Sequence, residues 1–265
     1  MDTEWARLVK KEVWDLSTVD EWHNVARRAR DAGKEVAFGY VFGICVLKNA
    51  ELPEGHPSRK YKGRVVFQGN RVVNQCWEAA IFQDLGSAPA TLEASRVADF
   101  MGCVPGYRLT VADAEQAYIQ AELRGIETWV ALPEEAWPAH WHKLYKGKKP
   151  VVQLRKALYG HPDSGTFWEE HCDAAVRKAG FEPVGPSWPS CYYNKELGLF
   201  LVIYVDDFKL ARPASALEEG WSRLRKGLSI EPHKYVDEKP AMYLGCSLEQ
   251  SRRRLPDGSM ATFID

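Results

Sequence analysis

The sequence predicts an α+β fold in which an antiparallel sheet is backed by helices. Segments with helical apolar spacing and segments rich in β-branched and aromatic residues follow each other irregularly, and several of the latter read as hairpins. The chain has 265 residues, of which 45% are hydrophobic and 27% charged, a composition typical of globular proteins with a large core. No segment rich in Pro, Gly and Ser divides the chain, so the sequence marks no domain boundary.

The first third of the chain predicts two helices followed by two strands. The amino-terminal segment reads as a helix, and "STVDEWHNVARRARDAGK" predicts another, with a capping box of Thr18 and Glu21 and a stop at Gly33. "EVAFGYVFGICVL" and "GRVVFQG" predict strands joined by a long polar loop. The apolar face of the second helix would consist of Trp22, Val25, Ala26 and Ala29.

The middle of the chain predicts a helix and three strands. "TLEASRVADFMGC" has helical spacing at Leu92, Val97 and Met101. "YRLTVADAEQAYIQAEL" begins as a strand and becomes helix-like after Asp113. "ETWVALP" and "VVQLRKALYG" predict short strands.

The last third predicts two helices and two hairpins. "TFWEEHCDAAVRKAGF" reads as a helix with Thr166 and Glu169 at capping-box spacing and Gly180 at its end. "LFLVIYVDDFKLA" predicts two strands joined at its acidic pair, and "ALEEGWSRLRKGL" predicts an amphipathic helix. The final segment predicts a hairpin that turns at residues 256–258, where the sequence is Pro-Asp-Gly.

Cysteine spacing and the amino terminus indicate an intracellular protein, cytoplasmic or nuclear. The six cysteines are scattered and include no C-x-x-C pair, so we expect reduced, mostly buried thiols. The first residues are too charged for a signal peptide, and no apolar run approaches the length that crosses a membrane.

Charge gives a local signal but no global one. A net charge of −1 provides no overall attraction for nucleic acid. The stretch "WHKLYKGKKPVVQLRK", however, places six basic residues between Lys143 and Lys156 with two aromatic residues among them. Such a cluster is either a solvated face or a set of phosphate contacts, and the sequence alone leaves both interpretations open.

Two adjacent carboxylates, Asp206 and Asp207, interrupt an apolar run and admit two interpretations. Asp is common in hairpin turns. Two carboxylates about 4 Å apart also repel each other by about 4 kcal/mol at an effective dielectric near 20, and a divalent cation would remove this penalty. Two-metal phosphoryl transfer needs a further acid, and Asp113 is a candidate because it ends an apolar strand, although Asp there could also be a helix N-cap.

Several short motifs occur together in a recognisable order. They are "YKGRVVFQGN", "DAEQAYI", "VVQLRKALYG" followed by Trp168, "SWPSCYYN", "YVDD" and "YLGCSL". In these motifs the sequence resembles the reverse transcriptase domain of copia-type long-terminal-repeat retrotransposons, from roughly Trp14 to Leu248. The resemblance implies a right-hand polymerase fold and RNA- or DNA-templated DNA synthesis with two Mg²⁺ or Mn²⁺ ions, a primed template and dNTPs as partners.

The resemblance also implies how the chain is divided. The ranges are 1–34 for an N-terminal helical segment, 35–105 for the fingers, 106–123 for the palm with the first Asp, 124–157 for a fingers insertion, 158–250 for the palm with the YVDD hairpin, and 251–265 for an incomplete C-terminal hairpin. On this division the chain stops before the thumb and RNase H segments, and further polyprotein domains such as an integrase would lie outside it.

Roles for individual residues follow from the same resemblance. Asp113, Asp206 and Asp207 would be the catalytic, metal-binding acids. Tyr118 would be the steric gate that rejects a 2′-hydroxyl, or else only an aromatic residue on a helix face. The remaining dNTP-binding positions would be Lys62 and Arg64, which could equally be a solvated strand edge, together with Ala114 and Gly160.

The sequence departs from the family pattern at two motifs. Gln68 replaces the second basic residue of the fingers motif, and "LYGHPDSG" introduces His161, Pro162 and Asp163 where the family has a Lys and a Gln. These departures leave an alternative open, namely an inactive remnant that keeps the fold and binds nucleic acid. An unrelated metal-dependent phosphatase or nuclease using the same acids is a third alternative, although the seven histidines show no grouping near them.

Overall fold

The chain forms two compact units in a computed structural model that describes residues 1–82 and 88–265. One unit comprises Met1–Leu85 and Ala121–Trp168, and the other comprises Gly86–Gln120 and Glu169–Asp265. Each unit is therefore built from two stretches that are far apart in the sequence. This interleaving explains why the sequence shows no single linker between them.

The first unit is built around a six-stranded sheet with the order β1-β7-β6-β2-β3, to which β4 adds by pairing with β2. Its strands pair in antiparallel fashion except β2 and β6, which are parallel. The elements are α1 (Asp2–Lys10), β1 (Trp14–Glu21), α2 (Trp22–Asp31), β2 (Val36–Lys48), β3 (Lys60–Phe67), β4 (Val73–Asn74), β6 (Glu127–Ala131), η2 (Glu134–Ala136), α4 (Trp141–Leu144) and β7 (Pro150–Leu154).

The apolar face predicted for α2 is confirmed, whereas its predicted start is wrong. Trp22, Val25, Ala26 and Ala29 are buried in one cluster with residues of β2, β6 and β7. The helix begins at Trp22, and the residues before it form β1. Thr18 therefore makes no capping box; its hydroxyl donates to the carbonyl of Asp15 at 2.7 Å.

The second unit is built around a six-stranded, fully antiparallel sheet with the order β12-β5-β11-β10-β9-β8. The predicted mixed architecture, with an antiparallel sheet and helices against it, is thus present. The elements are α3 (Leu92–Gly102), β5 (Tyr107–Asp113), η1 (Ala117–Gln120), α5 (Ser164–Lys178), which begins in the first unit, β8 (Glu182–Pro183), β9 (Cys191–Asn194), β10 (Leu199–Tyr204), β11 (Asp207–Pro213), η3 (Ala214–Ala216), α6 (Leu217–Arg225), β12 (Lys234–Tyr235), β13 (Ala241–Tyr243), β14 (Cys246–Leu248), β15 (Gln250–Arg254) and β16 (Met260–Ile264).

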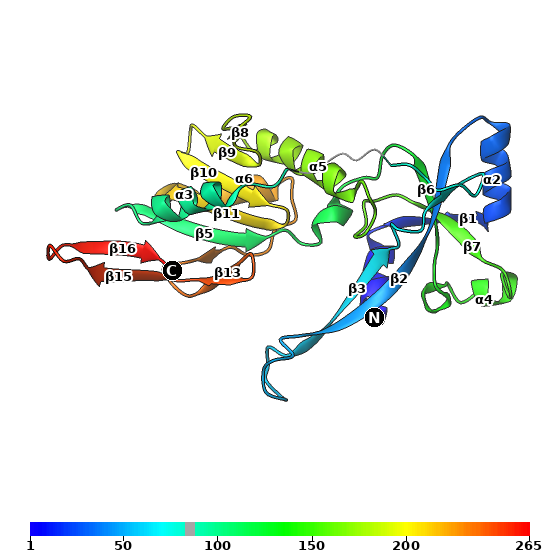
Figure 1. The fold of residues 1–265 in the computed structure, drawn as a ribbon, viewed down its shortest axis with the longest axis horizontal. Helices are drawn as coiled ribbons and strands as arrows, with labels where there is room; N and C mark the ends of the chain where they lie inside the picture. Colours follow the sequence, from blue (N-terminus) through cyan, green and yellow to red (C-terminus); the bar gives the residue numbers. More distant parts are fainter. Residues whose placement is uncertain (83–87) are drawn as a thin grey trace. The chain divides into compact units, whose positions relative to one another are not determined.

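Helices cover both faces of this sheet (Figure 1). The helix α3 packs against residues of β5, β10 and β11 that point to one face, in a cluster that also includes β13. On the opposite face α6 lies against β5, because the indole N–H of Trp221 donates to the hydroxyl of Thr110 at 3.0 Å. The strands β10 and β11 are consequently buried on both sides, which accounts for their continuous apolar sequence.

Three details of the second unit differ from the sequence predictions. Of the residues at helical spacing in α3, Val97 and Met101 pack against the core, but Leu92 is exposed, and the fully buried residues are small ones such as Ala94 and Ala98. The helix α5 begins at Ser164, so Thr166 lies inside it and cannot cap it as predicted. The hairpin of β15 and β16 turns at the predicted residues 256–258, but the preceding β13–β14 hairpin was not predicted.

All six cysteines are free thiols, as predicted, but the expectation that most are buried is wrong. Cys172 and Cys191 are buried, whereas Cys45, Cys76 and Cys246 are exposed. The exposed ones lie on strands with a solvated face or in a loop. Within the described residues, no helix is long and apolar enough to cross a membrane.

Candidate active site

The pairing of β5 with β11 brings two of the predicted acids together. Asp113 is the last residue of β5 and Asp207 the first of β11, and the antiparallel register sets them directly opposite each other. Directly opposite residues of an antiparallel pair have Cα atoms about 4.5–5.5 Å apart. The register is held by buried apolar residues further along both strands, among them Leu109 and Leu210.

The third acid, Asp206, lies in the tight turn between β10 and β11. The last ladder pair is Tyr204 with Asp207, so the turn consists of Val205 and Asp206 alone. The amide of Ala114, the residue after Asp113, donates to the carbonyl of Asp206 at 2.7 Å. This bond links the acidic turn to the end of β5. All three acidic residues therefore lie at the same end of the β5–β11 strand pair.

The backbone of the turn is strained. Val205 has a φ of +56°, a conformation that a β-branched residue rarely adopts and that two-residue hairpins usually give to Gly or Asn. Strain of this kind costs about 1–3 kcal/mol and persists only where the surrounding structure enforces it. The buried strands on both sides and the bond to Ala114 supply that enforcement.

The three acids repel one another. Burial, together with the charges of Asp206 and Asp113, raises the pKa of Asp207 from 3.8 to about 6, and a hydrogen bond from the backbone of Leu244 opposes the rise. Asp113 and Asp206 are exposed, while Asp207 is partly buried. None of the groups that act on Asp207 is a cation, so its repulsion is not relieved within the described chain.

The carboxylate oxygens at this end of the two strands suit Mg²⁺ or Mn²⁺, which prefer hard oxygen ligands. Within the described residues, no group of three or more His, Cys, Asp or Glu side chains is close enough to form a complete metal site by itself. Mg²⁺ commonly keeps several waters and takes one or two carboxylates plus substrate phosphates. Paired but uncompensated carboxylates fit that mode better than a closed protein cage.

The other predicted positions divide between the two units. Ala114 and Tyr118 lie in the second unit with the acids; Ala114 is buried, and Tyr118 belongs to the short helix η1 that follows β5. Lys62 and Arg64 are exposed on β3 of the first unit, opposite Val46 and Ile44 of β2. Their roles in binding dNTP stay predictions.

Gly160 lies in the first unit, where the backbone requires a glycine. Its φ is +89°, and an added Cβ would lie 2.2 Å from the carbonyl oxygen of Phe67. The adjacent amide of Phe67 donates to the carbonyl of Tyr159 at 2.8 Å. The glycine thus permits close packing between the end of β3 and the loop before α5, and a contact with a nucleotide stays a prediction.

The residues that depart from the family pattern are in part structural. His161 is buried between the rings of Phe67 and Phe82, with centroids 5.0 and 5.1 Å away, and burial lowers its pKa to about 4. Its Nε2 lies 3.5 Å from the hydroxyl of Thr128. A neutral, enclosed imidazole at this position serves packing rather than phosphate binding.

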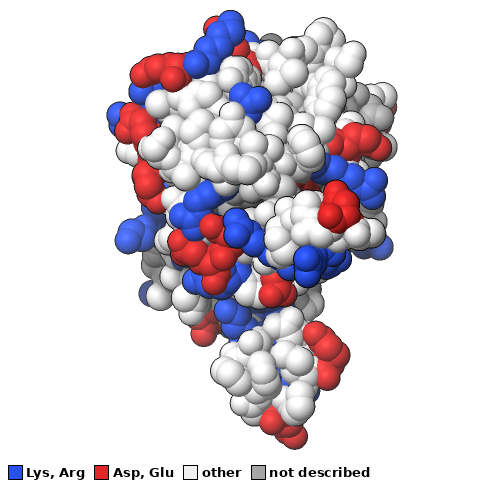
Figure 2. Space-filling model, turned by 90° about the vertical axis from the view of Figure 1, so that its left-hand side faces the viewer, with Lys and Arg blue, Asp and Glu red and all other residues white. Residues whose placement is uncertain are grey.

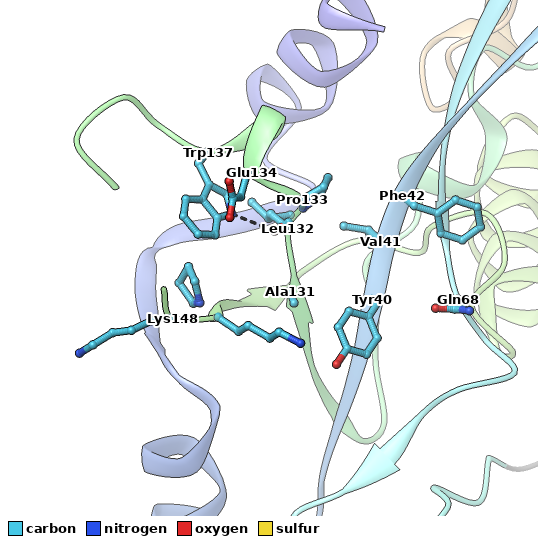
Figure 3. Close-up of a pocket in the computed structure, with 12 residues that line it drawn as sticks. Tyr40, Val41, Phe42, Gln68, Ala131, Leu132, Pro133, Glu134, Trp137 and Lys148 are labelled. Atoms are coloured by element: carbon cyan, nitrogen blue, oxygen red, sulfur yellow. Dashed lines mark hydrogen bonds between the residues drawn. The ribbon is translucent and has the colours of Figure 1, made fainter. Parts of the chain in front are cut away.

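A recess of about 460 Å³ opens in the first unit, between β2, the end of β6 and the start of β7 (Figure 3). The indole of Trp137 forms part of its wall and donates to the carbonyl of Leu132 at 2.8 Å. Lys148 pairs with Glu21 at 2.5 Å at the rim. The lining residues are Tyr40, Val41, Phe42, Gln68, Ala131, Leu132, Pro133, Glu134, Trp137, Lys148, Lys149 and Pro150.

Surface charge is mixed. On the face drawn in Figure 2, Lys and Arg side chains are interspersed with Asp and Glu side chains around uncharged areas. This agrees with the net charge of −1. Attraction for a polyanion must therefore come from local groups such as the basic stretch beside the recess, rather than from the protein as a whole.

The sequence analysis did not identify a buried lysine in the same sheet. Lys209, on β11, is 1% exposed and donates to Asp99 of α3 at 2.6 Å and to Ser95 at 2.8 Å. A lone Lys in an otherwise apolar strand is a signal that could have marked it, because such a residue is almost never fully buried without a partner.

Comparison with known proteins gives little further information. No family model and no curated protein matches the sequence. Among solved structures, the telomerase from Candida albicans in complex with a TWJ fragment of telomeric RNA matches with a TM-score of 0.44 and 9% sequence identity, over 94% of this chain. The chain spans about half the length of that telomerase, 48%.

Proposed function

We propose that the chain is a reverse transcriptase domain of the copia type, an RNA-directed DNA polymerase that adds dNTPs to a primer. The observation that supports this most is the pairing of β5 with β11, which sets Asp113 opposite Asp207 and beside Asp206. Two segments that are far apart in the sequence thus supply three carboxylates to the same end of this strand pair. On this proposal the second unit is the palm and the first the fingers.

The three acids would hold two Mg²⁺ or Mn²⁺ ions together with the triphosphate. When bound, such ions lower the pKa of the primer 3′-hydroxyl and neutralise the charge on the phosphates. In the reaction the primer 3′-oxygen forms a bond to the α-phosphorus while the bond from that phosphorus to the pyrophosphate oxygen breaks. Asp207 must be ionised to take part, which its pKa of about 6 permits at neutral pH.

The remaining residues would select and orient the substrate. Tyr118, five residues beyond Asp113, would place its ring under the sugar and exclude a 2′-hydroxyl. Lys62 and Arg64 would contact the triphosphate, for which a planar guanidinium is well suited. Ala114 and Gly160 would lie at the nucleotide with backbone rather than side-chain contacts.

The recess in the first unit supports binding of a single-stranded template. Its rings, Tyr40, Phe42 and Trp137, could stack on an unpaired base, while Lys149, which also lines it, could meet a phosphate. Stacking on aromatic residues does not depend on the base, as template-directed synthesis requires.

An inactive remnant that binds nucleic acid is the second candidate. The observation that favours it is the altered segment after Gly160, which lacks the Lys and Gln of the copia-type motif and in which His161 is buried beside the rings of Phe67 and Phe82. The two candidates differ in whether the folded chain catalyses extension.

Primer extension on poly(rA)/oligo(dT) with Mg²⁺ or Mn²⁺ distinguishes the two candidates. The parent chain, Asp206→Ala and the control Glu182→Ala are compared; Glu182 is an exposed carboxylate of the same unit, paired with Lys195 at 2.6 Å. We expect extension by the parent and the control and none by Asp206→Ala. If none of the three extends a primer that all of them bind, the remnant replaces the polymerase.

A further inference from the structure

The peptide group that joins Asp113 to Ala114 is hydrogen-bonded on both sides. Its N–H donates to the carbonyl of Asp206 at 2.7 Å, and its C=O accepts from the amide of Glu231 at 2.9 Å. The first bond leads to the acidic turn, and the second leads to the segment 229–231, which follows α6. The orientation of Asp113 therefore depends on where this segment lies.

The segment 229–231 lies beside the end of β5 without being part of a regular strand. The pairing of β12 with β5 ends at Val111, and the next bridge joins Ala114 to Ile230. Between these two pairs, two residues of β5 face three residues of the other segment, so the ladder is interrupted as in a β-bulge. One of the three is Pro232, which has no N–H to donate. The ladder alone therefore holds this stretch weakly.

A side-chain amide compensates for the interrupted ladder. Gln120, the last residue of η1, donates from Nε2 to the carbonyl of Ser229 at 2.9 Å and accepts from the amide of Ser229 at 2.8 Å. The same Nε2 donates to the carbonyl of Glu115 at 2.9 Å, so both of its N–H groups are used. Gln120 thus bonds to Ser229 as a residue of a neighbouring strand would, and it joins Ser229 to the chain just after Asp113.

A second side chain holds the same segment from the helix α6. The guanidinium of Arg225 donates to the carbonyl of Glu231 at 2.9 Å and to that of Ile230 at 3.4 Å. It also lies 5.5 Å from the ring centroid of Trp221, which is fully buried under the same helix. Arg225 therefore anchors the segment to α6, and Gln120 anchors it to the part of the chain that carries Asp113.

The need to satisfy backbone groups does not by itself explain the bonds of Gln120. Gln120 is half-buried and Ser229 is exposed, so water could bond to the same amide and carbonyls. Direct bonds from one side chain, in contrast, fix the distance between the segment 229–231 and η1. The arrangement is better explained by the position that it sets than by the polar groups that it satisfies.

We propose that Gln120 is a positioning residue for Asp113. By bonding to Ser229, it keeps the segment 229–231 against the end of β5. Glu231 can then donate to the carbonyl of Asp113 and fix the backbone from which this carboxylate extends. The inference rests on the proposed function in treating Asp113 as a metal ligand. Loss of a group that orients a metal ligand typically weakens metal binding about 10- to 100-fold.

The test compares Gln120→Met and Gln120→Asn with the control Gln250→Met. Met keeps the length of the side chain and removes its hydrogen bonds. Asn keeps the amide but is one methylene too short to reach Ser229 and Glu115 together. All three replacements are uncharged, so none of them changes the electrostatic attraction for a cation. Gln250 lies on β15 in the same unit and is half-buried like Gln120.

Two readouts are used: Mn²⁺ affinity of the folded chain, and the hydrogen-exchange rate of the Glu231 amide in metal-free protein. This amide bonds to Asp113 rather than to Gln120, so it exchanges faster only if the segment leaves β5. We expect both Gln120 variants to exchange Glu231 at least about tenfold faster and to bind Mn²⁺ at least about tenfold more weakly. Their urea midpoints should stay near that of the parent, because water replaces the lost bonds. Gln250→Met should match the parent in every measurement.

A folded Gln120→Met with the parent's Glu231 exchange would overturn the proposal. Faster exchange with the parent's Mn²⁺ affinity would also overturn it and leave Gln120 a role in the fold alone. If Gln120→Met does not fold, Gln120→Asn decides by the same criteria. A parent that binds no Mn²⁺ would instead reject the proposed function, and the Glu231 exchange rate would still decide whether Gln120 holds the Asp113 peptide in place. The two failures are thus separable.

Discussion

Val205 and Leu244 are both tips of two-residue turns, and both have a positive φ without being glycine. Val205 immediately precedes the acidic pair, so its strain lies in the turn that carries Asp206. A strained residue beside candidate catalytic groups is a feature of many functional sites, where the geometry of a side chain matters more than local stability.

Replacing Val205 with Gly should leave the protein as stable as the parent or slightly more stable. Relief of strain, about 1–3 kcal/mol, opposes the greater backbone freedom of Gly in the unfolded chain, about 0.5–1 kcal/mol. Val205→Ala keeps a Cβ, and with it most of the strain, so it isolates the effect of removing the two methyl groups. Urea unfolding measures both variants; a decrease above about 1 kcal/mol in Val205→Gly alone would contradict the strain at this position.

The raised pKa of Asp207 predicts that the stability of the metal-free protein depends on pH. Its pKa is raised to about 6 in the folded state, so the native chain holds this proton more tightly than the unfolded chain does. Its contribution to stability is therefore lost as the pH rises from about 4 to about 6. The full difference from 3.8 corresponds to about 3 kcal/mol, and solvent screening at a partly exposed group reduces it to roughly 1 kcal/mol.

The variant Asp207→Asn isolates this effect. In the presence of a chelator, we expect it to be more stable than the parent by roughly 1 kcal/mol near pH 7.5 and equal to it near pH 4. Added Mn²⁺ should stabilise the parent and not the variant. Denaturant unfolding at both pH values provides the measurement, and a variant that is less stable than the parent at neutral pH would show that the carboxylate is not repelled.

At the scale of elements, the small residues of α3 set how closely it approaches the sheet. Gly102 ends the helix, and an added Cβ would lie 2.7 Å from the Cβ of Leu109 on β5. That Cβ is bonded to the strand backbone and cannot rotate away. The neighbouring positions Ala94 and Ala98 are buried for the same reason, since larger side chains would push α3 off β5.

Gly102→Ala should therefore destabilise the protein, by about 1–2 kcal/mol. Overpacking costs about 1–3 kcal/mol and outweighs the roughly 1 kcal/mol by which Ala favours a helix over Gly. The control is Arg96→Ala, an exposed position on the same helix, which should change stability by less than about 0.5 kcal/mol. Thermal or urea unfolding that finds Gly102→Ala more stable than the parent would show that helix and strand are loosely packed here.

Most elements of the second unit could be predicted from the sequence because their apolar residues recur at a clear helical or strand spacing. The run from Leu199 to Tyr204 is continuously apolar and forms a doubly buried strand, and the acidic pair marks the turn. In α3 the apolar spacing was right for Val97 and Met101, which pack against the core, and wrong for Leu92, which is exposed. The most deeply buried residues of this helix are its smallest ones, which a hydrophobic pattern does not reveal.

Strands that depend on distant partners were harder to predict. The segment from Trp14 to Glu21 has the Ser, Thr and Asp residues of a helix start but forms β1, because it pairs with β7 more than 120 residues later. Of the candidate site, the three acids were predicted together. The pairing of Lys209 with Asp99 was not, since a lone Lys in an apolar strand signals a buried partner but does not say which distant residue supplies it.

At the scale of the whole molecule, charge is distributed so that any attraction for a polyanion is local. The net charge is −1, yet residues 141–150 of the first unit carry five basic side chains if His142 is counted. All four lysines of this stretch, Lys143, Lys146, Lys148 and Lys149, are exposed, and Lys148 is paired with Glu21. These lysines follow Trp137 in the sequence, and Lys149 lines the recess. Under the proposed function, unpaired bases would stack in this recess.

Replacing Lys143, Lys146 and Lys149 together with Gln should weaken binding of single-stranded RNA and reduce its dependence on salt. Each phosphate that is no longer neutralised by a lysine reduces the magnitude of the slope of log K against log salt by about 0.7. The three replacements together should therefore reduce this magnitude by about 2. The control Lys178/Lys195/Lys226→Gln removes three exposed lysines from the second unit and changes the net charge equally. Fluorescence anisotropy over a salt series measures both. Equal slopes in the two triple variants would mean that overall charge governs binding, and the basic stretch would then be a solvated face.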